Sequence, residues 1–280
     1  MNNTTIPKTT EKDDYYEDAF FTLWLIGISV SLVGLLIQSF LFIMVPGCRK
    51  FDEIILTEMT TSRLLYTTCE CYIMFYVQYN GFIVKTVLLV LYIHTDITFV
   101  VLMFVFTKNL YNKLVVVFPL PTYNIVLTSV TTWLTPFLIS LLCPLLLNMK
   151  GSFFNIFYTS YAHIKFVVCV LNGFIFVEIL RVAFKRGVGS NRNIRDYLKT
   201  ACINFVLVSI TSLQVCVTDV ISYYYSVIRS HTLVLIFCVI NSYQVLALTG
   251  IFVVLVRSKL NDSMIRLISI KLNNLMSTST

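Results

Sequence analysis

Seven long apolar stretches occupy this chain between about residue 20 and residue 256. A helix needs roughly 20 consecutive apolar residues to cross the hydrocarbon core of a bilayer. The composition agrees, because 57% of the residues are hydrophobic and 12% are charged, whereas an ordinary soluble domain has about 25% charged residues. A soluble protein has too little interior to hide this much apolar surface. We therefore expect an all-α membrane protein whose seven transmembrane helices form one bundle.

Turn and charge signals such as Pro46-Gly47, Asn80-Gly81 and Lys150-Gly151 separate the stretches. Strands of a β-barrel would alternate in hydrophobicity over about ten residues, and the apolar run 138–147 does not. Three parts follow: an acidic N-terminal tail at 1–19, the bundle at 20–256, and a short amphipathic eighth helix with a tail at 257–280. The seven predicted spans are 20–45, 54–79, 83–113, 124–148, 164–185, 197–223 and 233–256.

The basic residues predict how the bundle is oriented, because Lys and Arg near helix ends are retained on the cytoplasmic side. Of the 21 Lys and Arg residues, fourteen fall on one side of the predicted bundle, six on the other, and Arg63 lies inside a span. The N-terminus is therefore expected outside and the C-terminus inside, in a multi-pass protein of the plasma membrane. The net charge of +7 reflects this cytoplasmic face and not a nucleic-acid surface. The polar start shows no cleavable signal peptide, so the first span would act as a signal anchor.

The N-terminal tail carries two kinds of candidate modification site. Asn2 and Asn3 each begin an Asn-x-Thr sequon, which is usable only on the outer side of a membrane. Tyr15 and Tyr16 lie within the acidic run 11–18, which is the usual context for tyrosine sulfation. Sulfation would add fixed negative charge for a basic ligand, and a plainly solvated acidic tail is the alternative.

Motifs of metal, cofactor and enzyme chemistry are missing from the sequence. All eight cysteines fall within predicted spans or on the predicted cytoplasmic side, so no disulfide framework is expected. The three histidines are scattered, and no spacing of Cys and His indicates a metal site. The sequence has no His-rich box, no paired intramembrane aspartates and no Gly-x-Ser motif. We therefore expect a protein that is not an enzyme and that uses no metal and no cofactor.

Several short strings give the chain a resemblance to rhodopsin-like G-protein-coupled receptors. Tyr111-Asn112-Lys113 with Pro119-Leu120 resembles the family's Asp-Arg-Tyr box and the loop Pro-Leu that follows it. The other strings resemble motifs of the first, second, fourth and seventh helices in the family's order. They are Gly34 to Gln38, Leu56 to Leu65, Trp133 with Pro144, and Val254 to Arg266, which runs into the eighth helix.

The chain departs from the family at most of its switch residues. Asn112 stands where the family has its ionic-lock Arg, and Arg63 stands where the family has its sodium-site Asp. Gln38 replaces the first-helix Asn, while Gly250-Ile251 and Val254 replace the Asn-Pro and Tyr of the seventh helix. The sixth span has no Pro, and the external Cys pair is missing. This combination is similar to the orphan seven-helix receptors of gammaherpesviruses.

That resemblance implies a receptor at the host cell membrane with ligand-independent signalling through a Gi-type heterotrimeric G protein. It also implies a role in immune evasion, through reduced surface display of class I antigen-presenting molecules. Implied partners are the G protein, membrane lipids, host membrane proteins, and a peptide or chemokine as ligand. Nematode-type chemosensory receptors, which also lose these motifs, are an alternative. A decoy that does not signal, or a transporter, is another.

Ionisable residues at bilayer depth cost at least about 2.5 kcal/mol each, so they usually face the bundle interior and have partners. Arg63 is the most informative, because a guanidinium would repel the sodium ion that ordinary receptors bind there. Asp96 is its favoured partner, with Glu58 and Glu70 as alternatives. We hypothesise that Arg63 removes sodium control and favours constitutive activity; a purely structural ion pair is the other interpretation. The ionisable residues predicted at this depth are Glu58, Arg63, Glu70, His94, Asp96, Glu178 and Asp219.

Four of these residues are candidates for an acidic ligand pocket in the outer half of the bundle: Glu70, His94, Asp96 and Asp219. Ordinary polar contacts between helices, worth about 0.6 kcal/mol on average, are the alternative. Glu178 and Arg181 are one helical turn apart and are expected to form a local pair.

Coupling to a G protein is predicted at the cytoplasmic face. The candidates are the inner end of the third span and the basic residues that flank the hinge at Gly187 and Gly189. The same cations would also satisfy the positive-inside rule or bind anionic lipid. The coupling candidates are Tyr111, Asn112, Lys113, Lys185, Arg186, Arg192, Arg195 and Lys199.

Overall fold

The computed structural model is helical in every segment that it describes, and no strand occurs among those residues. The described residues are 11–44, 51–76, 81–115, 124–142, 152–185, 198–199, 201–202, 205–206, 209, 244–254 and 256–257. The long helices are α1 (Glu11–Met44), α2 (Phe51–Tyr76), α3 (Phe82–Leu114), α4 (Ile125–Ser140) and α6 (Ser152–Lys185). A shorter apolar helix spans Gln244–Val254.

These helices correspond to the first five predicted spans and to part of the seventh. α1 begins nine residues before the predicted start at residue 20, and α6 begins twelve residues before residue 164. The acidic run with Tyr15 and Tyr16 is therefore helical and continuous with the first span. The predictions were wrong at these two starts because hydropathy marks where apolar residues begin, whereas a helix extends through any residues that tolerate helical geometry.

Other predictions fall outside the described residues: most of the sixth span, the first part of the seventh and the eighth helix. The same holds for the sequons at Asn2 and Asn3, for Asp219, and for Arg186, Arg192 and Arg195.

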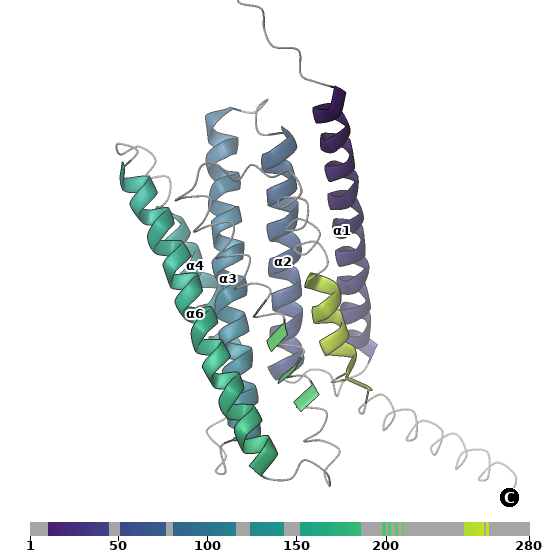
Figure 1. The fold of residues 1–280 in the computed structure, drawn as a ribbon, viewed down its shortest axis with the longest axis vertical. Helices are drawn as coiled ribbons and strands as arrows, with labels where there is room; N and C mark the ends of the chain where they lie inside the picture. The colour runs from purple at the N-terminus through teal and green to yellow at the C-terminus, as the bar shows by residue number, and fades with distance from the viewer. Residues whose placement is uncertain are drawn as a thin grey trace, which may run out of the picture.

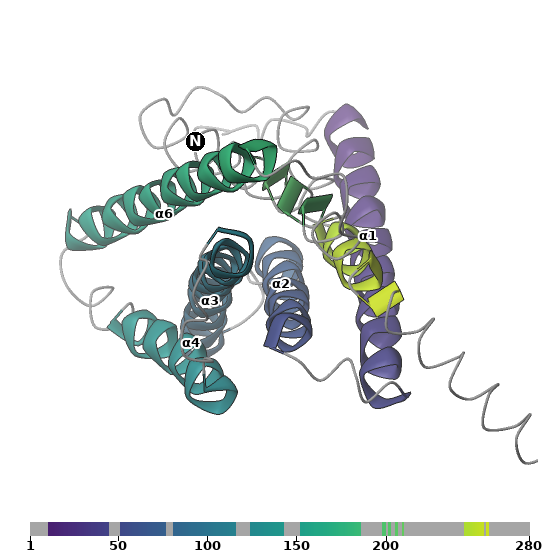
Figure 2. The same ribbon diagram turned by 90° about the horizontal axis from the view of Figure 1, so that it is seen from below.

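The helices run side by side, with α2 and α3 at the centre (Figure 1). Seen along the bundle, α1 lies on one side of this pair and α4 and α6 lie on the other (Figure 2). The helix Gln244–Val254 lies beside α1. We call the end of the bundle where α1 and α3 finish and α2 begins the lower end, as it is drawn in Figure 1.

Among the residues that the structure describes, three helices are long and apolar enough to cross a membrane: Phe21–Met44, Ile83–Leu114 and His163–Val182. α2 has 26 residues, but it includes the charged residues Asp52, Glu53, Glu58, Arg63 and Glu70. α4 and Gln244–Val254 are apolar but shorter. A chain with such helices is compatible with a membrane protein.

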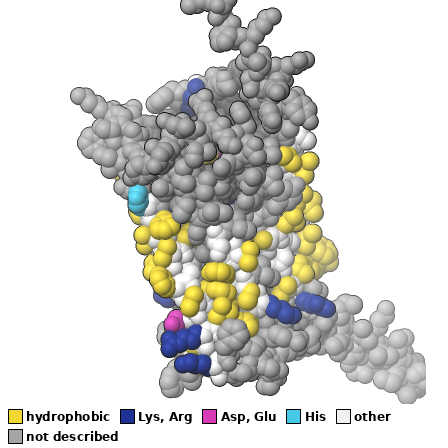
Figure 3. All heavy atoms as spheres, viewed as in Figure 1, with side chains coloured by type: hydrophobic (Ala, Val, Ile, Leu, Met, Phe, Trp, Pro, Cys, Tyr) yellow, Lys and Arg dark blue, Asp and Glu magenta, His cyan; other side chains and the backbone are white. Residues whose placement is uncertain are grey.

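The distribution of side chains is the one expected of a bundle in lipid. Large apolar side chains such as Ile43, Val126 and Phe174 are exposed on the outside, and Figure 3 shows a band of hydrophobic side chains with most of the visible Lys and Arg below it. The hydroxyls of many threonines, for example Thr60, Thr67 and Thr107, donate to the carbonyl four residues earlier in the same helix. Such bonds satisfy polar groups without a partner helix or water.

The core is built around α3, which packs against α2, α4 and α6. Its buried residues Phe99, Met103 and Phe106 belong to one hydrophobic cluster. Apolar residues of α2, of α6 and of the helix Gln244–Val254 belong to the same cluster. α1 joins this core through a close approach at Gly34, where an added Cβ would lie 2.6 Å from Oγ1 of Thr249. Small residues let membrane helices approach closely, so Gly34 brings the first and last described helices together.

Candidate functional site

An ion pair lies inside the bundle between α2 and α3. Arg63 Nη1 lies 3.7 Å from Asp96 Oδ1. The exposed fraction is 1% for Arg63 and 6% for Asp96. The pairing predicted from the sequence is therefore confirmed as a contact between helices, with Asp96 as the partner.

Aromatic rings complete the surroundings of the guanidinium. Arg63 Cζ lies 4.3 Å from the ring centroid of Tyr66 and 5.3 Å from that of Phe99. A cation over an aromatic face is stabilised by the quadrupole of the ring, and most strongly where water is excluded. Arg suits this position better than Lys because its planar group stacks on rings while it pairs with a carboxylate.

A second cation reaches the same carboxylate from α6. Lys165 Nζ donates to Asp96 Oδ2 at 2.8 Å, and the side chain is 10% exposed. Sequence reasoning missed this contact, because Lys165 was counted among the cations of the outer side. One signal was available: Lys165, Cys169, Asn172, Phe176 and Ile179 recur at helical spacing and form the buried face of α6. We call Arg63, Asp96 and Lys165 together the charge cluster.

Hydrogen bonds on both sides of the charge cluster join α2 to α3. Ser62 Oγ donates to the carbonyl of Thr95 at 2.6 Å. The hydroxyls of Tyr66 and Tyr92 are 2.7 Å apart, and their rings stack at 4.7 Å. These contacts follow the antiparallel alignment of the two helices, so the cluster sits on a polar seam.

The structure describes two further members of the predicted ligand pocket, His94 and Glu70. His94 is buried against α4, with ring centroids 5.7 Å from Trp133 and 5.6 Å from Phe137. Glu70 is half-buried nearly two turns beyond Arg63 on α2. The Asp96 carboxylate faces two cations, so it does not present an open acidic surface to a basic ligand.

A second polar cluster lies at the lower end. Asp52, in the first turn of α2, accepts a hydrogen bond from Asn109 on one carboxylate oxygen and from Lys113 on the other. The Asp52 side chain is 4% exposed and that of Lys113 is 34% exposed. Sequence reasoning did not single out Asp52, although the start of α2 and the end of α3 lie at the same end of an antiparallel pair.

The predicted coupling residues are distributed around this lower end. Tyr111 packs against the core cluster, and Asn112 is half-buried. Lys185 and Lys199 are exposed. The predicted local pair of Glu178 and Arg181 is confirmed, at 3.3 Å on the exposed face of α6.

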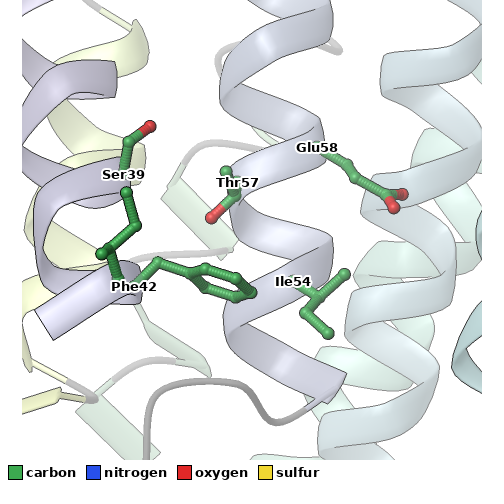
Figure 4. Close-up of a pocket in the computed structure, with 6 residues that line it drawn as sticks. Ser39, Phe42, Ile54, Thr57 and Glu58 are labelled. Carbon is green, nitrogen blue, oxygen red and sulfur yellow. The ribbon is translucent and has the colours of Figure 1, made fainter. Parts of the chain in front are cut away.

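A shallow groove of about 240 Å³ lies between α1 and α2 and is almost entirely apolar. Phe42 of α1 lies along it, and Ile54 and Thr57 of α2 lie opposite (Figure 4). The groove opens outward, where lipid would lie, and it brings together no reactive groups. Its lining residues are Ser39, Phe42, Ile43, Ile54, Thr57 and Glu58.

A scan against protein-family models and a search of curated proteins both find no match to this chain. Within the described residues, no three His, Cys, Asp or Glu side chains are grouped so as to hold a metal ion. The cysteines Cys69, Cys71 and Cys202 are free thiols. The candidate functional site in the described part of the chain is therefore the charge cluster, in which one buried carboxylate pairs with two cations.

Proposed function

We propose that this chain is a divergent rhodopsin-like receptor with seven transmembrane helices that signals through a heterotrimeric G protein without a bound ligand. The observation that carries the proposal is the buried ion pair of Arg63 and Asp96. Charges at bilayer depth are costly and usually mark functional sites. This pair lies at the position where the receptors that the chain resembles hold a sodium-binding carboxylate.

The charge cluster explains how such a receptor would escape sodium control. In the receptors that the chain resembles, a sodium ion bound at this depth steadies the inactive state. Arg63 and Lys165 place two fixed cations on the one carboxylate of Asp96. A sodium ion would meet repulsion and no free anionic oxygen there, so the restraint that sodium exerts would be lost.

Packing between the first and last described helices supports the receptor assignment. Gln38, at the position that resembles the first-helix Asn, donates from Nε2 to Thr249 Oγ1 at 3.1 Å. Gly34, one turn earlier, permits the close approach to the same residue. Two positions of the first-helix string thus lie against Thr249 of the seventh predicted span.

The orientation in the membrane, the type of G protein and the location are proposed from the sequence alone. The positive-inside rule puts the lower end in the cytoplasm and the N-terminus outside, and the resemblance suggests Gi-type coupling at the host cell membrane. A decoy that does not signal is the main alternative, and it predicts a persistent complex with a host membrane protein and no coupling.

The test is basal dissociation of G-protein subunits in cells that express the chain without added ligand, matched for surface level. We expect a signal above empty vector that falls in Asn112→Ala. We also expect Arg63→Asp to change the basal signal at equal surface expression. No signal with any family of G proteins would overturn the proposal in favour of the decoy, and an unchanged signal in Arg63→Asp would overturn the role of Arg63.

A further inference from the structure

We propose that Asp52 is a positioning residue for the lower end of α3, and that Lys113 serves this internal contact instead of contacting the G protein. This inference rests on the proposed function for its effect on signalling. The contact itself rests on three side chains from two helices. Asn109 and Lys113 of α3 donate to separate oxygens of the Asp52 carboxylate. We call these three residues the lower clamp.

The spacing on α3 makes the clamp specific. Asn109 and Lys113 are four residues apart, so they lie on the same face of the helix, one turn above the other. One neutral donor and one charged donor therefore approach the same carboxylate from successive turns. A rotation or slide of α3 by a fraction of a turn would break at least one of the two bonds.

The start of α2 suits a carboxylate as the receiving group. Asp52 lies in the first turn of its helix, where unpaired backbone N–H groups and the helix dipole favour negative charge. The side chain is almost fully buried, and a charge-assisted hydrogen bond is about twice as strong as a neutral one. The start of α2 therefore favours the negative charge with which Asp52 binds α3.

The clamp lies directly beside the predicted coupling residues. Asn112 precedes Lys113, and Tyr111 packs into the core. Because Lys113 reaches back to α2, its ammonium group is committed to Asp52. Among the described coupling candidates, Asn112, Lys185 and Lys199 then remain for contact with a partner protein. The clamp would act on signalling by fixing the direction in which α3 presents Asn112.

Lys108 offers a matched control for this idea. It is an exposed lysine on α3, five residues before Lys113, and it belongs to none of the polar contacts described above. Lys108→Met removes one positive charge from the same end of the same helix without touching Asp52. A role for net charge at the lower end predicts equal effects of Lys108→Met and Lys113→Met, whereas a positioning role predicts an effect of Lys113→Met alone.

The first measurement detects the contact in the purified full-length protein. Lysines are ¹³C-dimethylated, which retains their charge, and the Lys113 signal is assigned by its loss in Lys113→Arg. We expect Asp52→Asn to shift the NMR signal of Lys113 and Lys108→Met to leave it in place. An unshifted Lys113 signal in Asp52→Asn would overturn the clamp, whatever the signalling assay gives.

The second measurement is basal G-protein dissociation at matched surface level. We expect Asp52→Asn and Lys113→Met each to lower the signal by roughly threefold to tenfold, which is the effect of losing one hydrogen bond of ordinary strength. The full strength of a charge-assisted bond is not expected because the Lys113 side chain is 34% exposed to solvent. Lys113→Arg keeps the positive charge and should retain at least half of the signal, and Lys108→Met should stay within about twofold of the unsubstituted chain.

The outcomes separate the two proposals. An equal loss in Lys108→Met, or a loss in Lys113→Arg as large as that in Lys113→Met in a protein that reaches the surface, would overturn the positioning role. A silent unsubstituted chain would overturn the proposed function, and with it the effect of Asp52 on signalling. The NMR result would then decide whether the clamp exists as a structural contact.

Discussion

Lys165 Nζ of α6 lies 2.8 Å from Asp96 Oδ2 of α3, on the carboxylate whose other oxygen faces Arg63 of α2. One acidic side chain thus joins three helices. Each of its two cations is buried, so water competes only weakly for either. The stability of the bundle should therefore depend on this carboxylate more than on any exposed ion pair.

Lys165→Met should lower the free energy of unfolding by about 3 kcal/mol, which is the smallest loss typical of breaking a buried ion pair. A loss this small is expected because Arg63 still compensates Asp96. The measurement is unfolding in mixed micelles titrated with dodecyl sulfate. Arg181→Gln on the same helix breaks an exposed pair and should cost at most about 1 kcal/mol. Equal losses in the two variants would contradict the assignment of Lys165 to the core.

Replacing sodium chloride by choline chloride should leave the basal signal of the unsubstituted chain unchanged in isolated membranes. Arg63 and Lys165 already compensate Asp96, so sodium has no vacant anionic site in the cluster. Arg63→Asp adds a carboxylate beside Asp96 and should make the signal fall as sodium rises. A sodium-sensitive signal from the unsubstituted chain would show that Arg63 does not replace the ion.

Gly34→Ala should destabilise the protein by about 1–3 kcal/mol, because the new Cβ would overpack the contact with Thr249. The added variant Thr249→Ala removes Oγ1 and should recover much of this loss. Gly173→Ala is the control, since an added Cβ there meets no atom within 4 Å; helix propensity predicts that it stabilises by up to about 1 kcal/mol. Thermal unfolding of the purified protein measures all three, and a harmless Gly34→Ala would refute the close approach.

Tyr66→Phe should have a small effect on stability, about 0.6 kcal/mol, which is typical of a hydrogen bond between membrane helices. The substitution removes the hydroxyl bond to Tyr92 but leaves the ring over Arg63. Tyr66→Ala should cost several times more because it also removes the ring. Comparable losses in the two variants, measured by thermal unfolding, would mean that the hydroxyl and not the ring supports the cluster.

The sequence predicted the helices well where apolar length alone determines them. The third span, predicted at 83–113, agrees with α3 within one residue at each end. The starts of α1 and α6 were missed because each helix continues through residues that are not apolar. Hydropathy indicates which side chains prefer lipid to water. A helix does not end where its side chains change from apolar to polar.

Predictions about side chains succeeded or failed according to the geometry of the helix. The Arg63–Asp96 pair was predictable because a buried guanidinium needs a carboxylate, and few were available. Grouping His94 with Asp96 was less sound, since residues two apart on an α-helix do not face each other; His94 contacts α4 instead. Lys165 and Asp52 were missed because their roles depend on which helices are neighbours, and that arrangement is not encoded within a single span.

The shared carboxylate also bears on how the chain enters a membrane during synthesis. A lone Arg or Lys near the middle of a helix costs about 2.5–3.5 kcal/mol to insert. α2 would leave the ribosome with Arg63 before Asp96 has been made, so we expect α2 to settle into lipid only when α3 accompanies it as a helical hairpin. Lys165 emerges later, after its partner is already in place. The order of residues along the chain thus gives each buried cation a counter-ion by the time its helix is stably inserted in the membrane.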